Sequence, residues 1–150
     1  MDLKLTGHNV IITGGTKGIG RAIAETLAEE GCNIAICARS ADDVSSAVDA
    51  LSAKGVKVTR QALDVADGDA FAAWINSVGE ELGGIDAFVS NVSGGNAPGD
   101  AGWISQFNYN ILSAVHGVEA CKPFFEKSAN ASVVMISTTA ALEHFMNAGP

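Results

Sequence analysis

The sequence predicts an α/β protein built on a doubly wound parallel sheet, and three observations support this fold class. Short apolar runs of strand length alternate along the 150 residues with segments of helical periodicity. The apolar runs lack polar alternation, which is typical of strands covered on both faces. Glycine-rich or polar segments follow the carboxyl ends of these runs. With right-handed crossovers, this succession of elements favours the strand order 3-2-1-4-5.

The elements follow one another regularly. A strand is expected at residues 8–13, and a helix at residues 19–30 ends at Gly31. A second strand at 33–38 precedes a helix that Ser40 caps. The later elements are a strand at 56–63, a helix at 67–82, a strand at 85–90, a loop at 91–102, a helix at 103–127 and a strand at 131–137. The side chains expected to face the sheet are Ile19, Ala22, Ile23, Leu27, Ala28, Val44, Val48, Leu51, Phe71, Trp74, Ile75 and Val78.

Composition narrows the function classes. Seventeen acidic against nine basic residues give a net charge of −8, which argues against nucleic acid as a main partner. The first residues lack the apolar core of a signal peptide, and no apolar run is long enough to span a membrane. Cys32, Cys37 and Cys121 have no metal-ligand spacing, so we expect buried, reduced thiols in a cytoplasmic protein without a metal site.

A glycine-rich turn joins the first strand to the first helix. Residues 13–20 read Thr-Gly-Gly-Thr-Lys-Gly-Ile-Gly. The first glycine permits a tight turn, and a backbone without side chains lets a pyrophosphate approach the helix N-terminus, where N–H groups are unpaired. The turn therefore predicts a dinucleotide site. Its expected contact residues are Gly14, Thr16, Lys17, Gly18, Ile19 and Gly20.

The spacing Thr-Gly-x-x-x-Gly-x-Gly resembles the short-chain dehydrogenase/reductase family, and the resemblance extends over nearly the whole chain. A general similarity to 3-oxoacyl-carrier-protein reductases accompanies it. The resemblance implies a Rossmann sheet, hydride transfer with a nicotinamide cofactor, and a small carbonyl or alcohol as substrate. It also implies a homo-oligomer when the chain is full length, with residues 1–150 as the NADP-binding part of a larger single domain.

The end of the second strand bears on the choice of cofactor. In the family, an acidic residue there binds the ribose 2′-hydroxyl of NAD, and Ala38 occupies its place. Arg39 and Ser40 follow, and the planar guanidinium of Arg39 suits the 2′-phosphate of NADP(H), with Lys17 as a second cation. The alternative is that both cations are ordinary surface residues. The aspartates at 42–43 count against NADP(H), although helix capping explains them better.

Asp64 and Val65 stand at the end of the third strand. In the family an Asp-Val pair at this place contacts the adenine ring, with the carboxylate accepting from the exocyclic amine. The alternative is a turn or helix-cap aspartate, a role that Asp67 fills equally well.

Asn91 follows the fourth strand in the sequence Ser-Asn-Val-Ser-Gly, where the family has Asn-Asn-Ala-Gly. The resemblance implies that Asn91 fixes the central sheet and lines the cofactor groove. Ser93 replaces a family glycine, which puts the local turn geometry in doubt, and Gly94 and Gly95 are the residues available to absorb the change.

Three further residues match the family's catalytic positions. Asn110 matches the asparagine that holds a helix distortion and a bound water. Ser137 and Thr138 match the two serines after the fifth strand, and Thr138 takes the place of the one that donates to the substrate oxygen. The alternative is that these polar groups only satisfy local backbone. His144 is a candidate for lining the substrate pocket.

The family's Tyr-x-x-x-Lys pair is expected directly after Pro150. The only tyrosine, Tyr109, belongs to the long helix and has no lysine four residues later. The 150 residues alone are therefore expected to stop before strands 6 and 7, to be inactive, and to expose the fifth strand. Two other functions remain open: a non-catalytic NADP-binding or interaction module, and another doubly wound nucleotide binder such as a methyltransferase.

Overall fold

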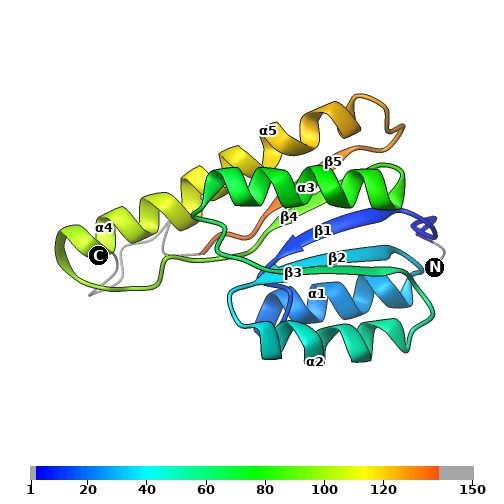
Figure 1. The fold of residues 1–150 in the computed structure, drawn as a ribbon, viewed down its shortest axis with the longest axis horizontal. Helices are drawn as coiled ribbons and strands as arrows, with labels where there is room; N and C mark the ends of the chain where they lie inside the picture. Colours follow the sequence, from blue (N-terminus) through cyan, green and yellow to red (C-terminus); the bar gives the residue numbers. More distant parts are fainter. Residues whose placement is uncertain (1–2, 139–150) are drawn as a thin grey trace.

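Residues 3–138 are described by the computed structural model, which contains a five-stranded parallel sheet. The strand order is β3-β2-β1-β4-β5, which confirms the predicted topology. The strands are β1 (Asn9–Thr13), β2 (Asn33–Ala38), β3 (Val58–Ala62), β4 (Ala87–Ser90) and β5 (Ser132–Met135). Figure 1 shows the twisted sheet between two layers of helices.

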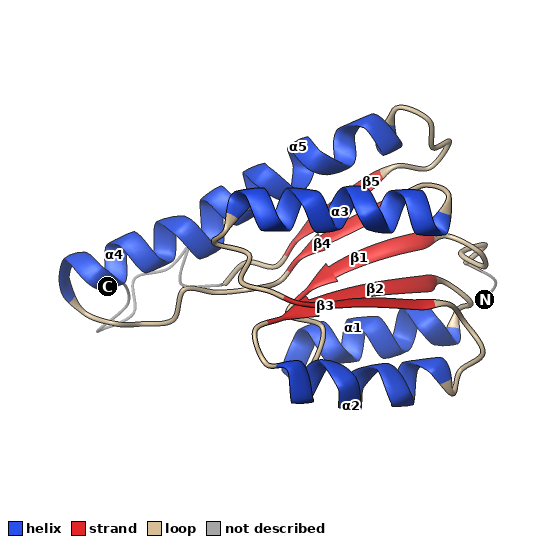
Figure 2. Cartoon of the chain, viewed as in Figure 1, coloured by secondary structure: helices blue, strands red, loops and turns tan. Residues whose placement is uncertain are grey.

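Helices cover both faces of the sheet. They are α1 (Gly18–Glu29), α2 (Ala41–Ser52), α3 (Gly68–Leu82), α4 (Gly99–Gln106), the π-helical segment η1 (Phe107–Leu112) and α5 (Ser113–Phe125). In Figure 2, α1 and α2 lie below the sheet, whereas α3 and α5 lie above it. The helix α4 extends beyond the carboxyl ends of the strands, so it stands at the edge where the candidate site was predicted.

Alternation along β1 divides the core into two layers. Val10 and Ile12 pack with the helices α1 and α2, whereas Ile11 packs with α3 and α5. Successive side chains of a strand point to opposite faces, so each central strand contributes to both layers. The predicted inward residues of α2 and α3 are all buried. The three cysteines are free and buried, as expected.

The residues of α1 that face the sheet differ in part from those predicted. Ile19 is 62% exposed and Ala22 is exposed as well, because the residues packed on the sheet are Gly20, Ala24 and Ala28. These three small residues recur at a spacing of four and let the helix backbone approach β1 closely. The expectation that Ile19 and Ala22 face the sheet was therefore wrong.

The edge strand β3 is less buried than its apolar run suggested, whereas the exposure of the other edge strand, β5, agrees with the expectation. All of β5 is exposed, and β3 is at best half-buried. Val133, Val134 and Met135 are 42%, 46% and 57% exposed. An edge strand packs fewer neighbours than a central one, so burial on both faces holds only for the middle of this sheet.

The long helix begins earlier than predicted and is not regular. It starts at Gly99 instead of Trp103, after Pro98 in extended conformation, and Asp100 lies in its first turn. Proline just before a helix and an acidic first turn both favour a helix start, so part of the predicted loop is helical. The helix then passes through the π-helical segment η1 before α5.

Candidate functional site

A pocket of about 350 Å³ opens at the carboxyl ends of the strands, where β1 lies between β2 and β4. This is the switch point of a doubly wound sheet, at which such folds bind ligands. Its lining residues are Gly14, Thr16, Lys17, Cys37, Ala38, Arg39, Ser40, Asp43, Leu63, Asp64, Val65, Asn91, Val92, Ser93 and Tyr109.

Two glycines of the glycine-rich turn, Gly14 and Gly20, stand where a side chain would meet neighbouring atoms. Gly14 has φ +66°, in the left-handed region, and its N–H donates to the Cys37 carbonyl at 2.9 Å. A Cβ on Gly20 would lie 2.4 Å from both the Gly14 carbonyl oxygen and the Asn91 side-chain nitrogen. The backbone of α1 can approach the turn only because Gly20 is a glycine.

The N-terminus of α1 has neither a side-chain cap nor an acidic residue in its first turn. Its N-cap residue, Lys17, makes no side-chain capping bond, and its first turn contains no acidic residue. The first N–H groups and the positive end of the helix dipole are therefore not neutralised by the helix's own side chains. Such a terminus is suited to an anion, and phosphate groups commonly bind at one.

Most of the predicted cofactor residues come together. Those in the pocket wall are Gly14, Thr16, Lys17, Arg39, Ser40, Asp64, Val65 and Asn91. Gly18, Ile19 and Gly20 do not line the pocket and form the first turn of α1, directly after Lys17.

The end of β2 brings both charge signs into the pocket. Arg39 is exposed, and Ser40 caps α2 by accepting a hydrogen bond from the Asp43 N–H at 3.2 Å. Asp43 also lines the pocket. The cap explains why an acidic residue stands here, but its carboxylate still opposes an anion near Arg39. Below them, burial raises the pKa of the Cys37 thiol to about 12, so this group is neutral.

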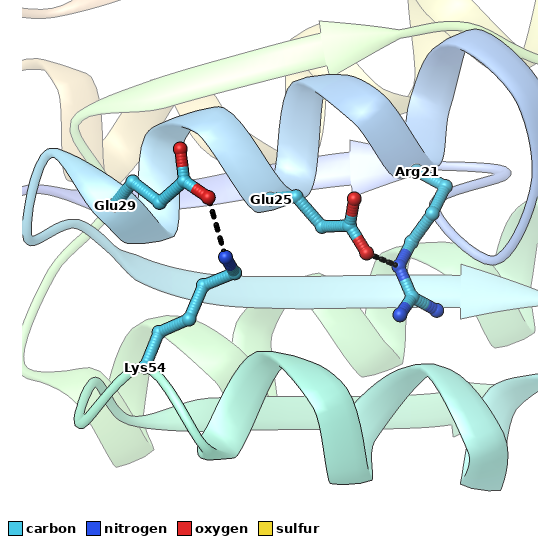
Figure 3. Close-up of polar contacts among 4 residues, drawn as sticks. All are labelled: Arg21, Glu25, Glu29 and Lys54. Carbon is cyan, nitrogen blue, oxygen red and sulfur yellow. Dashed lines mark hydrogen bonds and ion pairs between the residues drawn. The ribbon is translucent and has the colours of Figure 1, made fainter.

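Two other basic residues form ion pairs away from the pocket. Figure 3 shows Arg21 paired with Glu25 at 2.7 Å and Lys54 paired with Glu29 at 2.6 Å, on the α1 and α2 side of the sheet. Neither pair involves a residue that lines the pocket. The pocket's cations are thus Lys17 and Arg39.

Asp64 is not the cap of α3. Asp67 fills that role, because its carboxylate accepts from the Ala70 N–H at 3.1 Å. Oδ1 of Asp64 accepts from the Ala66 N–H at 3.0 Å, and Oδ2 accepts from the Tyr109 hydroxyl at 2.7 Å. The carboxylate therefore forms a local turn and at the same time faces the pocket.

Asn91 ties the ends of the two central strands together. Its N–H donates to Oγ1 of Thr13 at 2.9 Å, and its side-chain amide donates to the Thr13 carbonyl at 3.1 Å. The Thr13 hydroxyl donates in turn to the Val89 carbonyl at 3.4 Å. These bonds hold β1 and β4 at the point where the pocket begins.

Asn110 lies in η1 and contacts the loop after β4. Its Oδ1 accepts from the Gly94 N–H at 3.0 Å, and its amide nitrogen donates to the Gln106 side chain. Gly95, with φ +77°, supplies the left-handed residue in this loop. The π-helical segment therefore fixes the chain that follows Asn91.

Ser137 and Thr138 lie past the carboxyl end of β5 and are exposed. The Ile136 N–H donates to the Ser90 carbonyl at 2.9 Å, which continues the pairing of β5 with β4. Both hydroxyl residues stand on the same edge of the sheet as the pocket but are not part of its wall. His144 falls outside the described residues.

Sequence reasoning missed Tyr109 as a pocket residue. It was placed on the long helix, without a role. The structure puts its ring in the pocket wall, with the Arg39 guanidinium carbon 5.8 Å from the ring centroid. Its neighbour Asn110 was no guide to this position, because consecutive residues of a helix point to different faces.

Residues 3–138 contain neither a candidate metal site nor a candidate membrane-spanning helix. No group of three or more His, Cys, Asp or Glu side chains in this part is arranged to hold a metal ion. Within the same residues, no helix has the length and apolar character needed to cross a membrane.

The model of the short chain dehydrogenase family matches residues 8–150. Isoepoxydon dehydrogenase of Penicillium expansum is 33% identical over 148 residues, covering 94% of this chain and 56% of the relative. Dehydrogenase/reductase SDR family member 4 of Oryctolagus cuniculus is 32% identical over 152 aligned residues, covering 97% and 58%. The chain thus spans a little over half the length of these relatives.

Solved structures agree with the fold. A 7α-hydroxysteroid dehydrogenase complexed with NADH and a 7-oxo bile acid conjugate superposes with a TM-score of 0.90 at 28% identity, covering 97% of this chain and 59% of the other. L-Sorbose reductase of Gluconobacter frateurii, complexed with NADPH and L-sorbose, gives 0.84 at 32% identity, covering 90% and 54%. The chain belongs to the short-chain dehydrogenase/reductase family.

Proposed function

We propose that the protein is an NADP-dependent oxidoreductase that reduces a carbonyl or oxidises an alcohol of a small substrate. Residues 1–150 would form the NADP-binding Rossmann part of a larger single domain. The observation that carries the proposal is one pocket whose wall contains Arg39 and Lys17, the N-cap residue of a helix without acidic residues in its first turn. Such a pocket fits a dinucleotide that bears an additional phosphate.

The residues fit the cofactor group by group. The cradle kept open by Gly14 and Gly20 suits the pyrophosphate, and the carboxylate of Asp64 is placed to accept from the adenine amine. Arg39 and Lys17 are the cations for a 2′-phosphate. When bound, the cofactor supplies or accepts the hydride. Similar solved structures hold NADPH in one case and NADH in another, so the cations decide our choice of NADP(H).

The residues to which we assign catalytic roles lie at the carboxyl ends of the strands, on the same edge of the sheet as the pocket. We assign Thr138 the hydrogen bond to the substrate oxygen, with Ser137 beside it, and Asn110 the support of the loop that borders the site. Tyr109, the only tyrosine of the 150 residues, donates to Asp64 at the pocket wall. Its hydroxyl is therefore not assigned to proton transfer to the substrate.

Assembly into a homo-oligomer and a cytoplasmic location complete the proposal. Large apolar side chains are exposed along α4, η1 and α5, at Trp103, Ile104, Phe107, Ile111 and Val115. An exposed apolar surface of this kind is typical of a contact between subunits. The three cysteines are free thiols, which supports a reducing compartment.

The test is to measure the dissociation constants of NADPH and NADH for the wild-type protein and for Arg39→Asp. We expect the wild type to prefer NADPH, and Arg39→Asp to lower that preference by about 10- to 100-fold, because a charge-assisted bond is replaced by repulsion. Arg60→Asp is the control, since Arg60 is exposed on β3 and does not line the pocket.

A second variant tests the opposite direction. Asp43→Asn removes the negative charge next to Arg39, so we expect the preference for NADPH to rise about two- to fivefold. Equal binding of NADPH and NADH by the wild type, or an unchanged preference in Arg39→Asp, would refute the cofactor assignment. Binding of NADPH without turnover of any carbonyl or alcohol would favour the non-catalytic module.

A further inference from the structure

Three residues from three separate segments meet at one end of the pocket. Arg39 follows β2, Asp64 lies between β3 and α3, and Tyr109 belongs to η1. The Tyr109 hydroxyl donates to Oδ2 of Asp64 at 2.7 Å, and the guanidinium carbon of Arg39 lies 5.8 Å from the Tyr109 ring centroid. The Tyr109 side chain thus contacts both Asp64 and Arg39.

Together with a backbone hydrogen bond, the bond to Tyr109 fixes the orientation of the Asp64 carboxylate. One oxygen is held by the Ala66 N–H at 3.0 Å and the other by the Tyr109 hydroxyl. With a donor at each oxygen, the carboxyl plane is fixed while lone pairs remain for a further donor. The same bond is the largest cause that raises the pKa of Tyr109, and it outweighs the opposing effect of the nearby Arg39 cation, so the phenol stays protonated and remains a donor across the neutral pH range.

The tyrosine ring plays a different part toward Arg39. Arg39 is exposed, and a long exposed arginine samples many rotamers. The ring's π face attracts the guanidinium and limits this freedom. A cation held in one region loses less entropy when an anion binds.

The ring itself is held firmly. Tyr109 packs against the core layer formed with α3 and α5, and the Ser113 hydroxyl donates to its carbonyl at 2.6 Å. It lies within the π-helical segment, where the chain departs from regular helix. The half-buried tyrosine that contacts Asp64 and Arg39 is therefore anchored to the core by its packing and by this backbone bond.

We infer that Tyr109 is a positioning residue that holds Asp64 for the adenine ring and Arg39 for the 2′-phosphate of the cofactor. This inference rests on the proposed function. It assigns two separable effects to one side chain: the hydroxyl sets the affinity for any adenine dinucleotide, and the ring sets the preference for NADPH over NADH.

The separation is tested with Tyr109→Phe and Tyr109→Leu in the intact protein, by measuring dissociation constants for NADPH and NADH. Tyr109→Phe keeps the ring and loses the hydroxyl, so we expect both constants to rise by the same factor, about two- to tenfold. Tyr109→Leu loses both, so we expect in addition a two- to fivefold fall in the preference for NADPH, roughly the strength of an exposed cation–π contact.

A double-mutant cycle shows whether the ring acts through Arg39. In an Arg39→Ala background, Tyr109→Leu is expected to leave the ratio of the two constants unchanged, because no guanidinium remains to be positioned. A general loss of structure would weaken the binding of both nucleotides without changing the ratio of their dissociation constants. Thermal midpoints of all variants are measured alongside, and the isosteric Tyr109→Phe variant gives the test of the hydroxyl even if Tyr109→Leu fails to fold.

The outcomes separate this inference from the function on which it rests. A wild type that prefers NADPH, combined with unchanged constants in Tyr109→Phe or an unchanged ratio in Tyr109→Leu, overturns the positioning role alone. A fall in the ratio that persists without Arg39 overturns it too. A wild type without preference for NADPH overturns the proposed cofactor and, with it, the part assigned to the ring.

Discussion

Replacing Gly20 by alanine tests whether close approach of the helix backbone builds the pocket. A Cβ at this position would lie 2.4 Å from the Gly14 carbonyl oxygen, which belongs to the turn and has no rotamer to escape into. Alanine gains about 1 kcal/mol over glycine inside a helix. Overpacking costs about 1–3 kcal/mol, and a backbone obstacle favours the upper end. We therefore expect Gly20→Ala to lower the free energy of unfolding by about 2 kcal/mol.

The expected change in melting temperature is a fall of about 4–8 °C, measured by calorimetry or circular dichroism. Binding of NADPH is expected to weaken at least tenfold, about 1.4 kcal/mol, because the obstructing groups on Gly14 and Asn91 line the pocket. The size of this second effect distinguishes damage to the site from simple loss of stability.

Gly79→Ala is the matched control. Gly79 is also a buried helical glycine, and a Cβ there would lie 2.3 Å from the Phe124 ring, far from the pocket wall. A side chain can rotate away, so we expect a loss of about 1 kcal/mol or less and an NADPH affinity within twofold of the wild type. The reasoning fails if Gly20→Ala melts and binds like the wild type, or if both variants lose affinity equally.

Two further predictions concern the buried thiols and the sheet edge. Burial raises the pKa of Cys37 and Cys121 from 9.0 to about 12, so their contribution to stability is complete below pH 9 and is lost as the pH rises toward 12. At pH 8 we expect iodoacetamide to label both thiols in urea and neither in the native protein, as read by mass spectrometry; native labelling would contradict this. A polypeptide of these 150 residues is expected to self-associate through β5, where Val134 is 46% exposed, and Val134→Lys should lower its light scattering. Gln61→Lys on the opposite, already polar edge should leave the scattering unchanged, and equal effects of both substitutions would argue against β5.

The strand order and the glycine turn could be predicted because their signals are local. Apolar runs separated by helical segments specify parallel strands, and the handedness of crossovers then leaves few topologies. Ser40 and Asp67 cap α2 and α3, roles that each residue's place before a helix had indicated. The cysteines are buried, as their small apolar character suggested.

The predictions of burial were wrong where packing between distant segments, and not the local sequence pattern, decided which side chains are covered. Ile19 matches a helical stripe, yet it is exposed because Gly20, Ala24 and Ala28 make the closer packing on the sheet. The run at residues 56–63 was expected to be a strand covered on both faces, but β3 lies at the edge of the described sheet and is at best half-buried. Pattern alone records apolarity and not position within the sheet.

By itself, the sequence determined the class of fold, the dinucleotide turn and the candidate cations, because each depends on residues close together in the chain. Only the tertiary structure decided how the pocket wall is completed. Tyr109 and Asp64 are 45 residues apart, and their hydrogen bond forms only after α3, β4 and η1 are in place. Neither periodicity nor a short motif encodes such a contact, since its geometry is set by the packing of η1 against the core layer of α3 and α5 on one face of the sheet.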